Sequence, residues 1–137
     1  MTRAHKVRNI CFTLLGAAAL VLKEQYTGPL EGIIYSYGGN VSASFAVYFI
    51  AGILTYQLRP SKLLAAAVAL LVVELFEALD GFGVMANVYD RADFAANAVG
   101  TGLALAVDAA VSGISARRSE RGERSDAGEG EQPAAGG

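Results

Sequence analysis

The chain of 137 residues has room for one domain, and 53% of its residues are hydrophobic whereas 18% are charged. Soluble domains carry about 25% charged residues, so this composition argues against a soluble protein. The net charge of −2 averages over unlike regions and indicates no nucleic-acid partner, and the single cysteine, Cys11, excludes an internal disulfide.

Apolar segments divide the chain into four candidate membrane spans. A helix needs about 20 largely apolar residues to cross the roughly 30 Å hydrocarbon core. Lipid offers the backbone no hydrogen-bond partners, so the spans should be helices. We therefore expect an all-α integral membrane bundle of four transmembrane helices, at about residues 9–22, 41–58, 63–79 and 92–116.

The first of these segments has a second interpretation. It spans only if Arg8 and Lys23 extend their charged ends toward the headgroups. A basic start followed by a dozen apolar residues also resembles a secretory signal peptide. The apolar run ends at Lys23 and Glu24 with no small-residue cleavage site after it, which favours a span. Cleavage would leave the orientation of the other spans unchanged.

Basic residues indicate the orientation of the bundle. Cytoplasmic loops carry an excess of Lys and Arg, and a cytoplasmic N-terminus puts nine of the 11 basic residues inside. These nine are Arg3, Lys6, Arg8, Arg59, Lys62, Arg117, Arg118, Arg121 and Arg124, and only Lys23 and Arg91 fall outside. We expect a multi-pass protein of the cell membrane with both termini cytoplasmic.

The ends of the chain differ from the apolar core at 9–116. Residues 1–8 form a basic cytoplasmic head in this interpretation. Residues 117–137 contain no large apolar side chain, and their Gly, Ala, Ser, Glu and Arg content predicts a disordered cytoplasmic tail. Four tyrosines fall in the expected outer loops and are typical of an interfacial aromatic belt: Tyr26, Tyr35, Tyr37 and Tyr89.

Acidic and amide side chains lie at similar depth in the third and fourth segments. A charged group at mid-helix costs about 2.5–3.5 kcal/mol on insertion scales, so such groups should face other helices. We expect Glu74, Glu77, Asp93 and Asn97 to form one outward-facing polar cluster, called here the outer acidic cluster. The alternative is structural: Asp90 and Asp93 cap a helix, and Asn97 bonds across helices as packing.

The fourth segment also carries small residues at four-residue spacing. Ala96, Gly100 and Ala104 would let a neighbouring helix approach closely. Asp108 continues the same side of the helix toward the cytoplasm and is a candidate inner acid.

The polar residues form a pattern that resembles the VanZ-like family of small membrane proteins. The pattern is E-x-x-E, then D-x-x-D-x-x-x-N-x-x-G, and it covers about residues 74–100 within a similarity from about 41 to 110. The matching residues are Glu74, Glu77, Asp90, Asp93, Asn97 and Gly100. The resemblance implies about four helices and a link to resistance against teicoplanin-type glycopeptide antibiotics.

Three positions depart from that family's pattern. The family usually has Gln where Glu77 stands, Arg near Asn87, and His near Ser44. The acidic residues of this chain therefore match most of the family's pattern, whereas the Arg and His of that pattern are missing.

Catalytic chemistry has little support in the sequence. The only histidine, His5, lies in the head and Cys11 lies in the first span, so no Ser-His or Cys-His pair forms at the outer acidic cluster. No phosphate loop or zinc spacing is present, so we expect no catalytic residue and no cofactor. Carboxylate and amide oxygens could hold a hard divalent cation, which leaves a metal open.

Three functions fit these expectations. The first is binding or protection, with the outer acidic cluster recognising a lipid or a small molecule of the cell envelope. The second is an accessory or structural subunit that packs through the small-residue face against a membrane partner. The third is an oligomeric proton or cation transporter, with Glu74 and Asp108 as outer and inner stations. The bilayer is a partner in each, and a homo-oligomer is required by the third.

Overall fold

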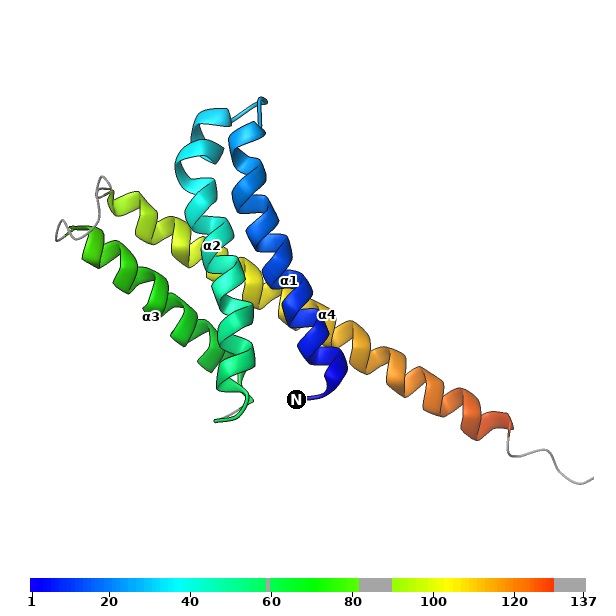
Figure 1. Ribbon diagram of the computed structural model, residues 1–137. Coiled ribbons are helices and arrows are strands. Elements are labelled where there is room, and N and C mark those ends of the chain that lie inside the picture. The colour runs from blue at the N-terminus through cyan, green and yellow to red at the C-terminus, as the bar shows by residue number, and fades with distance from the viewer. Residues whose placement is uncertain (59, 82–89, 130–137) are drawn as a thin grey trace, which may run out of the picture. The chain divides into compact units, whose positions relative to one another are not determined.

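The computed structural model describes residues 1–58, 60–81 and 90–129, and all of its regular structure there is helical (Figure 1). The all-α prediction is confirmed. The elements in chain order are α1 (Arg3–Leu22), the 3₁₀ helix η1 (Lys23–Gln25), α2 (Glu31–Thr55), α3 (Lys62–Gly81) and α4 (Arg91–Glu129). The chain forms two compact units, Met1–Ala106 and Val107–Gly137, and α4 contributes to both.

Among the residues that the structure describes, three stretches are long and apolar enough to cross a membrane: Arg3–Gln25, Glu31–Thr55 and Arg91–Arg118. Large apolar side chains are exposed along them, for example Leu14 at 62% and Val99 at 62%. These features indicate a membrane protein. Helix α3, which contains the expected third span, is not one of these three. It is more polar than they are, because each of its 18-residue stretches contains three charged residues, drawn from Lys62, Glu74, Glu77 and Asp80.

Helix α2 begins ten residues earlier than the expected span, at Glu31 rather than at 41. The sequence around Tyr35 and Tyr37, with two glycines after it, suggested a loop. Lys23 holds this part of the helix to the end of α1, because its Nζ donates to the carbonyl of Tyr35 at 3.1 Å and lies 5.5 Å from the Tyr35 ring centre. A Cβ at Gly39 would lie 2.9 Å from Lys23 Nζ, which is the end of a flexible side chain and could move to admit it.

The two ends of the chain are more helical than expected. Residues 3–8 of the basic head are the first turns of α1, and the hydroxyl of Thr2 accepts from the backbone N–H of His5 at 3.3 Å. Helix α4 continues to Glu129, whereas the composition predicts disorder from residue 117 onward. Ala, Arg and Glu are strong helix formers, and a helix of polar residues can extend from a packed one without burying surface. Residues 130–137 lie outside the described part.

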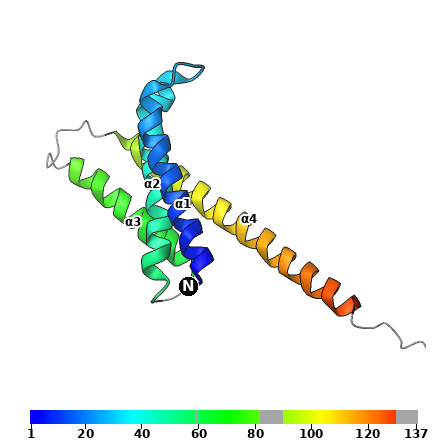
Figure 2. The same cartoon turned by 45° about the vertical axis from the view of Figure 1, so that its right-hand side comes forward.

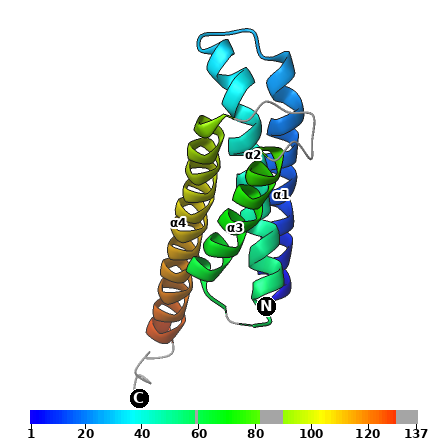
Figure 3. The same ribbon diagram turned by 90° about the vertical axis from the view of Figure 1, so that its left-hand side faces the viewer.

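Helix α2 is at the centre of the first unit. It lies beside α1 (Figure 2) and beside α3 (Figure 3). Gly16 of α1 faces α2 so closely that a Cβ there would lie 3.0 Å from both Ala46 Cβ and Ser42 O. The rings of Phe12 and Phe49 stack next to this contact with centroids 4.8 Å apart. Small residues bring the helices together, and aromatic rings fill the space beside them.

Candidate functional site

Glu77 of α3 and Asn97 of α4 meet in the first unit. The side-chain amide of Asn97 donates to Glu77 Oε1 at 3.5 Å, a long and therefore weak hydrogen bond. Asn97 is 2% exposed and Glu77 is half-buried. The expectation placed these residues at one depth in neighbouring helices, and the structure brings them into contact.

The start of α4 is held by Asp90. Its Oδ1 accepts from the backbone N–H of Ala92 at 3.0 Å, which is the geometry of an N-terminal cap. Its Oδ2 accepts from the hydroxyl of Tyr37 on α2 at 3.3 Å. For Asp90 the structural alternative therefore holds, and the cap also ties α4 to α2.

The remaining members of the outer acidic cluster lie one turn away from the contact. Asp93 precedes Asn97 by four residues, is half-buried, and its backbone N–H donates to the carbonyl of Asp90 at 3.1 Å. Glu74 precedes Glu77 by three residues, and its Oε2 is buried without a hydrogen bond from the described residues. The same is true of Thr101 Oγ1, one turn after Asn97.

Asp108 belongs to the second unit. Its backbone carbonyl accepts from the hydroxyl of Ser112 at 2.7 Å, and its Oδ1 lies 3.4 Å from the same hydroxyl. Its proposed partnership with Glu74 in ion movement stays a prediction.

The small residues of α4 pack inside this chain. Ala96, Gly100 and Ala104 are all buried, and Ala104 has no exposed surface. A Cβ built at Gly100 would collide with Ser44 Oγ and with the carbonyl oxygen of Val41, and would lie 2.9 Å from Val41 C. At Gly100, this face of α4 is the contact surface for α2.

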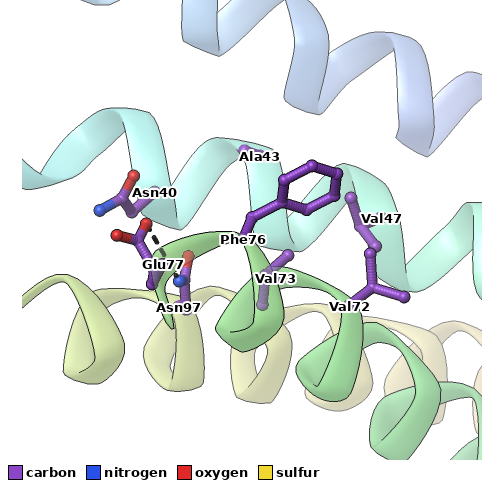
Figure 4. A pocket seen from close by; sticks show the side chains of 8 residues that line it. All are labelled: Asn40, Ala43, Val47, Val72, Val73, Phe76, Glu77 and Asn97. Carbon is purple, nitrogen blue, oxygen red and sulfur yellow. Dashed lines mark hydrogen bonds between the residues drawn. The ribbon is translucent and has the colours of Figure 1, made fainter. Parts of the chain in front are cut away.

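A pocket of about 190 Å³ opens next to the Glu77–Asn97 contact. Figure 4 shows three polar side chains gathered at one end, Asn40, Glu77 and Asn97. The rest of the lining is apolar and comes from α2 and α3, namely Ala43, Val47, Val72, Val73 and Phe76. We call this space the α2–α3 pocket. Its lining is suited to a group that is polar at one end and hydrocarbon at the other.

Asn40 was missing from the sequence-based site. With a span beginning at 41 it fell in an outer loop, whereas α2 carries it as a helical residue. One signal was available in the sequence: Asn40 precedes Ser44 by four residues, so the two lie on the same face of a helix. In the structure, the Ser44 hydroxyl donates to the backbone carbonyl of Asn40 at 2.6 Å. Phe76 and the valines were missed because apolar residues of a span are expected to face lipid.

The site holds hydrogen-bonding groups and a carboxylate rather than a nucleophile and base. In the described ranges, no three His, Cys, Asp or Glu side chains lie close enough together to hold a metal ion. Comparisons of the chain with models of protein families, with curated proteins and with solved structures find no match.

Proposed function

We propose that this chain is an integral protein of the cell membrane that binds an amphiphilic lipid or cell-envelope compound in the α2–α3 pocket. In this proposal all four helices span the bilayer, both termini are cytoplasmic, and the polar end of the pocket lies toward the outer surface. The distribution of Lys and Arg supports this orientation. Helix α3 is 20 residues long, about 30 Å at 1.5 Å per residue, which matches the hydrocarbon core.

One observation carries the proposal: the Glu77–Asn97 contact lies at the end of an otherwise apolar pocket. Small-molecule sites are mostly apolar, with a few placed polar groups that fix the orientation of the ligand. A carboxylate inside a membrane is costly, and a ligand head that bonds it would offset part of that cost. The resemblance to the VanZ-like family supports Asn97, which matches its pattern, and covers the position of Glu77, where that family usually has Gln.

Native mass spectrometry of the protein extracted from its membrane tests the proposal. Wild type should retain a lipid or small molecule, and Asn97→Ala should lose it, because the pocket then keeps only one of its two amides and Glu77 loses the hydrogen bond from Asn97. Asn9→Ala is the matched control: Asn9 is also a buried asparagine, 6% exposed, but it lies on α1 and is not part of the pocket lining. Equal retention by all three proteins would contradict the proposal, provided that circular dichroism shows the same helix content in each.

A further inference from the structure

We propose that the ligand of the α2–α3 pocket carries a protonated amine joined to a single hydrocarbon chain. This inference rests on the proposed function and names the chemical class that the same site would take.

The polar end of the pocket is rich in acceptors. Glu77 is the one charged residue among the eight that line it. The amide nitrogen of Asn97 points to Glu77, which leaves its carbonyl oxygen for another donor, and no described residue donates to that oxygen. Asn40 adds a second side-chain amide, drawn in Figure 4 with its nitrogen on the Glu77 side. A primary ammonium offers three donors and no acceptor, so it matches the carboxylate of Glu77 and the amide oxygen of Asn97.

Charge also selects against the common anionic heads. A phosphate or carboxylate placed at this end would bring negative charge against Glu77, with Glu74 three residues before it on α3. An ammonium instead donates a charge-assisted hydrogen bond to Glu77, in surroundings where water competes weakly. An alcohol could donate to the same oxygens, but its hydrogen bond carries no positive charge.

The size and shape of the pocket limit the apolar part of the ligand. Ligand pockets for drug-sized molecules measure about 300–1,000 Å³. The α2–α3 pocket, at about 190 Å³, is smaller and compares with the roughly 150 Å³ cavity that holds a benzene molecule. Its apolar lining runs one turn along α2, from Ala43 to Val47, and one turn along α3, from Phe76 to Val72. This space fits the first part of one alkyl chain rather than a fused ring system or two chains.

Binding of three probes to the full chain in phosphatidylcholine nanodiscs tests the inference. The probes are dodecylamine, 1-dodecanol and dodecyl sulfate, which share the chain and differ in the head. On wild type, dodecylamine should bind at least about tenfold more tightly than dodecanol, since a charged hydrogen bond contributes about 1.5–3 kcal/mol. Dodecyl sulfate should bind most weakly. This ranking needs no variant and so does not depend on how any variant folds.

Two variants locate the effect. Glu77→Gln keeps the size of the side chain and removes its charge, so it should lower the affinity for dodecylamine by about tenfold and leave dodecanol unchanged. Glu31→Gln is the control, because it removes an exposed carboxylate from the first turn of α2, outside the pocket. Equal loss in both variants would mean that the amine responds to the membrane-surface charge, and would overturn the inference.

The outcomes separate this inference from the proposed function. If dodecanol binds as tightly as dodecylamine and Asn97→Ala weakens both, the pocket binds amphiphiles and the ammonium inference is wrong. If none of the probes binds and wild type retains no lipid, both proposals fail.

Discussion

Gly100 of α4 lies directly against Ser44 of α2, with no room for even a single carbon atom between the two helices. Ser44 is itself fully buried, and its hydroxyl donates hydrogen bonds to the backbone carbonyls of Asn40 and Val41 on its own helix. A polar side chain at this contact therefore has its hydrogen bonds made within α2. The close approach brings the first turns of α4, and with them Asn97, up to the face of α2 that carries Asn40.

The Gly100–Ser44 contact predicts a large effect from one methyl group. Gly100→Ala should lower the free energy of unfolding by about 1–3 kcal/mol, because a packed interface must shift to admit the new atom. Gly102→Ala is the control, since a Cβ there meets nothing within 4 Å. It should leave stability unchanged or raise it by about 0.4–1 kcal/mol. Denaturant unfolding in detergent measures both, and equal effects would contradict the close contact.

The cap of α4 predicts coupling between two helices. Asp90→Ala should cost about 1 kcal/mol, because it removes both the bond to Ala92 and the bond to Tyr37. Tyr37→Phe should cost about 0.5–1 kcal/mol, and the double variant less than the sum of the two, since both remove the same bond. The free energies of unfolding of wild type, the two single variants and the double variant form a double-mutant cycle, and Glu24→Ala is the control. Strict additivity would show that the phenol and the carboxylate do not interact.

The link between α1 and α2 depends on Lys23. Lys23→Met retains most of the side-chain length and removes the donor to the Tyr35 carbonyl, so it should destabilise the protein by about 0.5–1.5 kcal/mol. Lys6→Met, on an exposed lysine of α1, should have little effect. Hydrogen exchange of residues 31–40 gives a local measure, and faster exchange there in Lys23→Met alone is the expected result. Unchanged exchange in both variants would show that Lys23 does not stabilise the first turns of α2.

Helix α3 should insert into a membrane poorly on its own. Its acidic residues each oppose insertion, by about 2.5–3.5 kcal/mol at mid-helix and less near the ends. In a glycosylation-reporter assay on isolated segments, the α2 segment should insert fully and the α3 segment only in part. Glu74→Leu should raise the inserted fraction of α3, because leucine favours insertion at a position where glutamate opposes it. Complete insertion of unaltered α3 would contradict the view that its acids need the neighbouring helices.

The sequence by itself determined the helical class and the membrane character, and it offered the cap at Asp90 as one of two interpretations. These follow from short-range physics: an apolar run in lipid must be helical, and an Asp just before an apolar run can accept from the next free N–H groups. It also placed Glu77 and Asn97 at one depth, because helical rise is constant and both positions can be counted from the same turn between helices.

Only the tertiary structure decided which polar residues share a pocket and which helix the small residues of α4 contact. The four-residue spacing distinguishes Gly100 from Gly102 in the sequence, but only the structure shows that Gly100 packs against Ser44 and Val41 of α2. Asn40 joined the site because α2 begins at Glu31, where Lys23 of the preceding helix holds a segment whose tyrosines and glycines suggest a loop. Such outcomes depend on which helix faces meet, and a contact between segments far apart in the chain leaves no mark in the local periodicity of either.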